Sequence, residues 1–343
     1  MMVVNEVAMK QREMKMTMAK SLCEQANLLE KEDKLTDAIL LYEKAYRYCI
    51  ECKKRDLDDA DELAMTAAYH LACVHWQEIN FGKALQYCKI SLRACRRFAD
   101  SDAAAYLQPL ANTLETLGTI YMTLRDCEHE IECYTELLPL YRALGHRGND
   151  SSIFQYVDVL SRIAFAHRKS KRYDLAKAEY HELISLLDRE EEQHFEHREL
   201  LLSVAYEDLG RLYMDLEDYL YAQGYLNKAI KTLTPSGKKH CGDLARMLDC
   251  KAHCLLKFNK VGGNMTSILA LADKAIKLDP ANADWYDTRG QVLLRMGDRE
   301  GALKMWDKVM EIEPNHLEIG GSDLYDALFL GTNVIKPIFA KQY

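Results

Sequence analysis

The stretch that decides the fold is Ala283–Asn315, ADWYDTRGQVLLRMGDREGALKMWDKVMEIEPN. It predicts two short helices joined by the turn Met296-Gly297-Asp298, and Pro314 ends the second helix because proline has no backbone N–H. Small residues, Gly290 and Ala302, stand where two antiparallel helices have to approach to roughly 8–10 Å. Larger apolar side chains fill the space around that crossing: Tyr286, Leu293, Trp306 and Val309.

Small residues recur along the whole chain at a nearly constant spacing. They are Ala26, Ala72, Gly118, Ala164, Gly210, Ala252 and Gly290, of which the first five are each 46 residues apart. A second small residue follows most of them after 12 residues, and larger side chains follow on the same helical face. A period sustained over this length indicates stacked helix pairs.

Two places break this pattern. Glu130 occupies the second small position of the third pair, and its bulk and charge predict that this pair splays or shifts its register. The sixth pair fits only if 4 extra residues sit in the turn that holds Gly262-Gly263-Asn264. An insertion in such a loop costs little free energy.

The spacing of Tyr286, Gly290, Ala302, Trp306 and Pro314 resembles the signature of a tetratricopeptide (TPR) repeat. The resemblance implies an all-α fold, a right-handed α-solenoid of about seven TPR helix-turn-helix repeats. A standard repeat has about 34 residues, so the longer period implies roughly twelve extra residues shared between two helices. Long-helix arrays of this kind resemble those of kinesin light chains and of bacterial peptide-sensing regulators.

The resemblance also implies how the chain is divided. We expect an N-terminal lead-in at 1–18, a TPR array at 19–316 and a C-terminal capping segment at 317–343. The tail TNVIKPIFAKQY is apolar for a free end. It either caps the last repeat, as solenoids require, or docks in a groove, and the sequence leaves both open.

Composition limits the classes of partner. The net charge of −8 argues against a general nucleic-acid footprint. The N-terminus lacks the apolar core of a signal peptide, and no window approaches the ~18 apolar residues of a membrane span. Without a secretion signal, the 11 cysteines predict reduced thiols. We therefore expect a cytoplasmic protein with no nucleic-acid and no membrane partner.

In TPR arrays the first helix of each pair lines a concave groove, so the resemblance implies where a partner binds. Aromatic groups interleaved with polar ones suit a protein or peptide segment, whose backbone needs hydrogen bonds and whose side chains need pockets. The alternative is that these side chains face water and bind nothing. The candidate partner-binding residues are Asn27, Tyr69, His70, Trp76, Asn112, Arg162, Phe165, Arg168 and Arg211.

One group of TPR domains grips the C-terminal carboxylate of heat-shock chaperones with a Lys-Asn-Asn-Lys-Arg clamp. Asn27 resembles the first asparagine of that clamp. The lysine expected at position 5 of that helix is Cys23, however, and position 6 of the next repeat is His70. The sequence therefore argues against a cochaperone of this kind.

No motif for metal or enzyme chemistry is evident. The lone Cys49-x2-Cys52 lacks the second pair that structural zinc needs, and the group from His240 to Cys254 is interpreted as thiols packed between helices. No Gly-rich phosphate loop, HExxH or GxSxG is present. We expect no cofactor, no metal and no catalytic residue. The favoured function is a non-catalytic scaffold or adaptor; the alternative is a TPR-type, peptide-sensing signalling regulator that acts on a phosphorylated response regulator.

Overall fold

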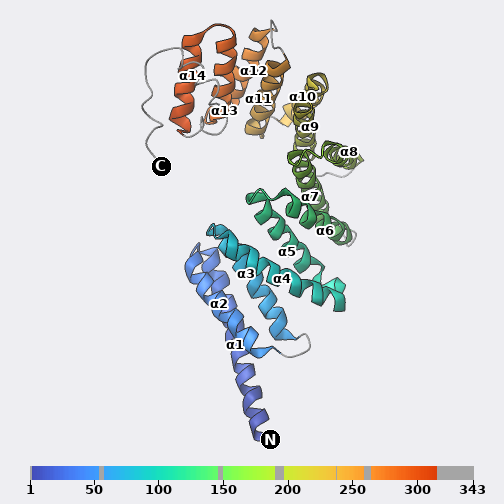
Figure 1. The fold of residues 1–343 in the computed structure, drawn as a ribbon, viewed down its shortest axis with the longest axis vertical. Helices are drawn as coiled ribbons and strands as arrows, with labels where there is room; N and C mark the ends of the chain where they lie inside the picture. Colours follow the sequence, from blue (N-terminus) through green and yellow to red (C-terminus); the bar gives the residue numbers. More distant parts are fainter. Residues whose placement is uncertain are drawn as a thin grey trace. The chain divides into compact units, whose positions relative to one another are not determined.

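The computed structural model describes residues 2–53, 58–145, 150–189, 197–236, 238–258 and 264–314. These residues form fourteen α-helices, one 3-10 turn at Thr234–Ser236 and no strand (Figure 1). None of the described helices has the length and apolar composition needed to cross a membrane. The expected capping segment at 317–343 lies outside the described residues, as does the turn that holds Gly262 and Gly263.

The helices fall into two compact units, Met1–Glu179 and Tyr180–Tyr343, each of which is described by itself. The first unit holds α1 (Met2–Lys31), α2 (Leu35–Cys52), α3 (Asp59–Gln77), α4 (Phe81–Ser101), α5 (Ala103–Thr123), α6 (Cys127–Gly145), α7 (Asp150–Lys169) and the start of α8 (Tyr173–Arg189). The second holds the end of α8, then α9 (Arg198–Asp215), α10 (Tyr219–Leu233), α11 (Cys241–Phe258), α12 (Met265–Leu278), α13 (Ala283–Arg295) and α14 (Arg299–Ile312).

Successive helices pack side by side in chain order from α1 to α7 in the first unit and from α9 to α14 in the second (Figure 1). Alternate helices also touch: α1 contacts α3, α3 contacts α5, α9 contacts α11, and α11 contacts α13. The first helices of successive pairs therefore share one face of each unit. We call it the first-helix face: α1, α3, α5 and α7 in the first unit, and α9, α11 and α13 in the second. The predicted all-α solenoid is confirmed.

The predicted small residues lie at the helix crossings. A Cβ added to Gly210 would lie 2.7 Å from Cγ of Leu226, and one added to Gly290 would lie 3.1 Å from Cε2 of Trp306. Both partners lie 16 residues further along the chain and are buried. In these two pairs the helices thus approach closely enough that an added Cβ meets the buried partner, and elsewhere in the chain the small position holds nothing larger than alanine.

The prediction that the third pair splays at Glu130 is wrong. A Cβ added to Gly118 would overlap the ring of Tyr134, so α5 and α6 approach as closely as the other pairs. Glu130 itself is buried, with 3 % of its surface exposed, and its carboxyl lies near enough to Arg162 of α7 to be influenced by that charge. A buried carboxyl at this position is therefore compatible with the close approach of the two helices.

The first helix of a pair ends on a residue in the left-handed region. The N–H of the following residue donates to the carbonyl five positions earlier, as Asn80 does to His75 at 2.8 Å, which is the Schellman arrangement. Gly297, with φ 87°, ends the first helix of the stretch that opened the sequence analysis. The equivalent non-glycine residues, with φ between 58° and 60°, are Asp33, Ile79, Arg125, Lys171 and Glu217, again 46 residues apart.

Ile79 is a costly residue for this position, because a β-branched side chain in the left-handed region is a conformational outlier. We expect Ile79→Gly to raise the free energy of unfolding by about 1 kcal/mol, since the Ile79 side chain is 73 % exposed and little packing is lost. Urea denaturation measures the change. Asp33→Gly is the matched control and should gain less, because aspartate tolerates this conformation better. Equal gains in both variants would contradict the assignment of strain to Ile79.

The close approach at Gly210 is tested by a pair of leucine substitutions. Gly210→Leu should lower the free energy of unfolding by about 2 kcal/mol or more, because the added side chain overlaps buried Leu226. Gly224→Leu is the matched control on α10, where an added Cβ meets nothing within 4 Å. It should leave stability unchanged or raise it slightly, since leucine favours a helix over glycine. Thermal and urea unfolding of both variants would show whether Gly210 is at a crossing.

Candidate partner-binding face

A hollow of about 280 Å³ opens on the first-helix face of the first unit, between α3 and α5. Tyr69 of α3 and Asn112 of α5, both predicted from the sequence, line it together. The hydroxyl of Tyr106 donates to Glu62 at 3.0 Å, which joins the two helices at one edge. The hollow is slightly smaller than the ~300–1,000 Å³ typical of small-molecule pockets, so it suits one or two side chains of a partner.

Exposed apolar side chains lie further along the first helices, at equivalent positions of successive pairs. Trp76 of α3 is 37 % exposed, and Met122 of α5, which lies 46 residues later, is 36 % exposed. Phe165 of α7 is also 37 % exposed. Large apolar groups that remain half in water on three neighbouring first helices are the kind of surface that protein contacts use.

Asn27 and His70 meet in a polar cluster around the buried Tyr42 of α2. The Tyr42 hydroxyl contacts Oδ1 of Asn27 and lies 2.8 Å from Oε2 of Glu30. The His70 ring stacks on the Tyr42 ring with centroids 5.1 Å apart, and its hydrogen bond to Glu30 lowers the pKa of that carboxyl. The sequence placed Asn27 and His70 on the correct helices but did not reveal that Tyr42 connects them.

Arg162 occupies the face of α7 that looks toward α5 and α6. Its Nε donates to Asp158 at 2.7 Å, and its Nη1 lies 4.0 Å from Sδ of Met122. Its guanidinium partly offsets the effect of burial on Glu130, whose pKa burial raises to about 7. Among the residues that the structure describes, Oε1 of Glu130 has no hydrogen-bond partner. Arg162 is therefore part of the packing between pairs as well as a candidate contact.

The side chains of Phe165 and Arg168 lie next to each other at the end of α7. The guanidinium of Arg168 lies 5.4 Å from the centroid of the Phe165 ring, and the ammonium of Lys169 lies 5.2 Å from it. Arg168 is buried, so most of its surface is covered by the chain itself. Phe165 therefore presents an exposed ring whose neighbours are cationic.

Arg211 lies in the second unit and holds a buried carboxylate. Its Nε donates to Glu207 Oε1 at 3.0 Å, while Nη1 of Arg246, on α11, lies 2.5 Å from the other oxygen. Glu207 is fully buried, so both charges are needed to compensate for its desolvation. The network ties α9 to α11 through their first-helix faces.

Sequence reasoning missed Arg246 and Asp249, although the signal was present. Arg246 lies six residues before the small residue Ala252, as Asn112 lies before Gly118, and Asp249 lies three residues before it, as Tyr69 lies before Ala72. Burial raises the pKa of Asp249 to about 7, and a hydrogen bond with Thr288 opposes the shift. Asp284 and Asp287 raise this pKa further. This part of the face is therefore mixed in charge and not basic.

The cysteine-rich stretches have no metal-binding geometry among the described residues. All 11 cysteines are free thiols. No group of three or more His, Cys, Asp or Glu side chains in the described ranges is placed to hold a metal ion. Burial raises the pKa of Cys49, and likewise that of Cys250, to about 12, as expected for thiols packed between helices.

Comparison with solved structures supports the fold. A tetratricopeptide repeat protein from Parabacteroides merdae matches with a TM-score of 0.60 and 14% identity, over 92% of this chain and 100% of that chain. The signal transduction ATPase PH0952 from Pyrococcus horikoshii has a tetratricopeptide repeat sensor. It matches with a TM-score of 0.60 and 15% identity, over 90% of this chain and 43% of that chain. Aspartyl phosphate phosphatase F from Bacillus subtilis matches with a TM-score of 0.51 and 14% identity, over 90% of this chain and 73% of that chain.

These identities establish the fold alone. No protein-family model and no curated protein matches the sequence. The chain therefore has the fold of tetratricopeptide-repeat proteins, and the resemblance drawn from Ala283–Asn315 is confirmed at that level.

The buried Glu130 makes stability depend on pH in a defined direction. Its pKa is about 7 in the folded protein and ~4.3 in an unfolded chain. The unfolded chain therefore releases this proton at lower pH, and stability is lost as pH rises from ~4.3 through about 7. We expect Glu130→Gln to be more stable than the wild type at pH 8, by on the order of 2 kcal/mol, and similar to it at pH 4.

Urea denaturation across this pH range measures the difference. Glu132→Gln, on the exposed side of the same helix, is the matched control and should leave the pH profile unchanged. A Glu130→Gln effect of the same size at pH 4 and pH 8 would show that the carboxylate is not desolvated.

Proposed function

We propose that this protein is a non-catalytic scaffold or adaptor that holds a segment of a partner protein on the first-helix face of its first unit. The observation that carries the proposal is the hollow lined by Tyr69 and Asn112, with Trp76 and Met122 exposed on the same two helices. A hollow for a side chain, together with exposed aromatic and thioether groups on the same helices, is typical of peptide-binding surfaces.

The polar groups of this face suit a peptide backbone. Asn112 accepts a hydrogen bond from Gln108 at 2.7 Å through Oδ1, which orients its amide NH₂ for other acceptors. A peptide carbonyl placed over the hollow is such an acceptor. The apolar wall then receives the adjacent side chain, and this combination fixes the register of an extended segment.

The titratable groups of the same face are engaged with one another. His70 lies 3.4 Å from Glu30, Arg162 is bonded to Asp158, and Tyr141 donates to Glu115 at 2.6 Å. Pairs of this kind stabilise the packing and orient the surface. They favour contact with a partner over proton transfer, because none of these groups is held beside an open cavity as a lone acid or base.

The proposal is tested by capture of partners from a lysate of the source cells. Trp76→Ala combined with Asn112→Ala should reduce captured partner by about 30-fold, because a hot-spot contact contributes ~2 kcal/mol or more. The melting temperature should change by only about 2 °C, since Trp76 is exposed and Asn112 is half-buried. Quantitative mass spectrometry of the captured proteins gives the readout.

The matched control removes the same chemistry from second helices. Leu40→Ala with Asn227→Ala deletes one exposed apolar side chain and one exposed amide, and capture should remain at the wild-type level. Undiminished capture by the Trp76/Asn112 variant would refute the proposed face. Hydrolysis of the phosphoryl group of a phosphorylated response regulator by the wild type would instead establish the signalling regulator expected as the alternative.

A further inference from the structure

The helix α4 is strongly basic in an acidic protein. Within Phe81–Ser101 it carries Lys83, Lys89, Arg93, Arg96 and Arg97 but only one acid, Asp100, whereas the whole chain has a net charge of −8. α4 is a second helix, so this charge lies on the face opposite the proposed peptide site. The peptide-binding function proposed above does not explain why basic residues are concentrated on α4.

Three of these cations form a line along the exposed side of α4. Lys89, Arg93 and Arg97 are spaced four residues apart and all are exposed, so neighbouring charges lie about 6 Å apart along the helix. We call this line the cationic stripe. Like charges at this spacing repel one another and destabilise a helix by ~0.2–0.5 kcal/mol per pair.

The cationic stripe has no carboxylate partner among the described residues. Arg93 donates from Nε to the carbonyl of Lys89 at 3.3 Å, and the Lys89 ammonium lies 5.5 Å from the centroid of the Tyr121 ring. The neighbouring cations differ: Arg96 binds Glu136 at 3.2 and 2.5 Å, and Lys83 lies 3.8 Å from Glu43. The stripe is thus left to attract an external anion, while the cations beside it are already neutralised.

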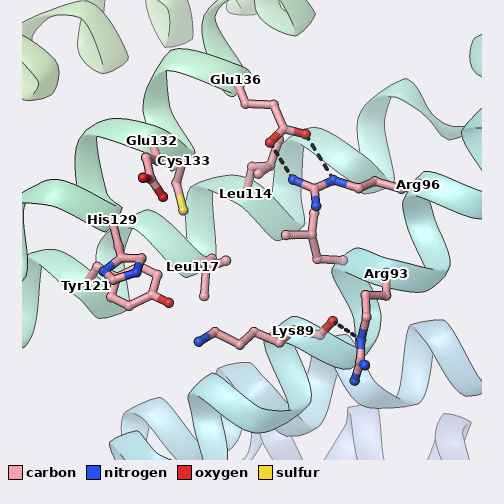
Figure 2. A pocket seen from close by; sticks show the side chains of 11 residues that line it. Lys89, Arg93, Arg96, Leu114, Leu117, Tyr121, His129, Glu132, Cys133 and Glu136 are labelled. Atoms are coloured by element: carbon pink, nitrogen blue, oxygen red, sulfur yellow. Dashed lines mark hydrogen bonds and ion pairs between the residues drawn. The ribbon is translucent and has the colours of Figure 1, made fainter.

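A hollow with an apolar floor adjoins each side of the stripe. Figure 2 shows the one between α4, α5 and α6, which has a volume of about 460 Å³. Lys89 extends along its edge, and the Arg96–Glu136 pair closes the opposite side. Its floor consists of Leu92, Leu114, Leu117 and Cys133.

The hollow on the other side lies between α2, α3 and α4. It has a volume of about 440 Å³ and is lined by Arg93 and Arg97 and by the apolar groups of Ile90, Ala94 and Met65. Lys53 and Asp61 also line it, and they form an ion pair with each other at 2.8 Å. Arg93 lines both hollows. A ligand that lies along the stripe would therefore meet cations at its centre and apolar recesses on either side.

We propose that the cationic stripe of α4 and its two hollows form a second docking surface, which binds an acidic, amphipathic helical segment of a partner protein. Charge complementarity selects the partner, because carboxylates four residues apart on a helix repeat at about 6 Å, as the cations of the stripe do. Leucine or phenylalanine side chains beside those carboxylates would enter the hollows. Glu132, on the wall formed by α6, limits how far an anionic segment can extend in that direction.

The test uses a fluorescein-labelled helical peptide of about 16 residues, with glutamate at every fourth position between leucine and alanine. We expect saturable binding by fluorescence anisotropy, weakened at least tenfold when salt is raised from about 0.05 M to about 0.5 M. Lys89→Glu with Arg93→Glu should weaken binding at least tenfold. Lys274→Glu with Lys277→Glu is the matched control: two exposed lysines on α12 make the same change in net charge, and affinity should stay within about twofold.

Two further measurements distinguish the contribution of charge from that of the apolar side chains, and binding at this surface from binding at the peptide site. A peptide with alanine in place of leucine should bind less tightly, because it leaves the hollows unfilled. The Trp76/Asn112 variant should bind the acidic peptide as the wild type does. Lys89→Gln with Arg93→Gln, which changes less charge, should also weaken binding, and circular dichroism should show that it folds.

Absence of binding by the acidic peptide would overturn the proposal, as would an equal loss in the α12 control. Tighter binding of phosphatidylserine vesicles or of single-stranded RNA than of the peptide, lost in the same α4 variant, would also overturn it and reassign the stripe to that class of ligand.

Discussion

The close approach of two helices at one small residue is the constraint on which every pair in this chain depends. A carbon atom added to Gly210 would overlap Leu226, and one added to Gly290 would lie in tight contact with Trp306. The large residue is buried because its partner is glycine or alanine, and the pair buries its apolar surface only at this separation. Stacking of successive pairs then covers what a single pair leaves exposed, which is why the same spacing has to recur along the sequence.

Most of the fold could be predicted from the sequence, because this constraint has a visible period. The 46-residue spacing identified the helix pairs, and the residues at the second small position are buried as expected. Glu130 could not be interpreted in the same way. A sequence shows that a residue is large and charged, but not that it can be buried within the influence of Arg162 while the two helices stay close. Side-chain direction depends on the neighbouring pair, which local spacing does not contain.

The sequence predicted which helices carry the candidate site, but it predicted fewer of the contacts that the side chains make there. Counting positions placed Tyr69 and Asn112 on successive first helices, and the structure brings them to one hollow. The sequence did not indicate that Arg168 is largely buried or that Arg246 and Arg211 both pair with Glu207. The contact between Arg246 and Glu207 joins successive pairs, and the two residues are 39 positions apart in the sequence. The cationic stripe lies on the opposite face, which a search for groove residues does not consider.

The left-handed residues that end the first helices carry a further consequence. These residues recur every 46 positions: Asp33, Ile79, Arg125, Lys171 and Glu217. A residue in one helix pair therefore has its structural equivalent 46 positions later, in the next pair. Excision or duplication of one such interval joins equivalent positions, so every helix keeps its length and its neighbour on each side. The length of the array can therefore change in evolution by unequal recombination, while a break at any other interval would misalign the crossings.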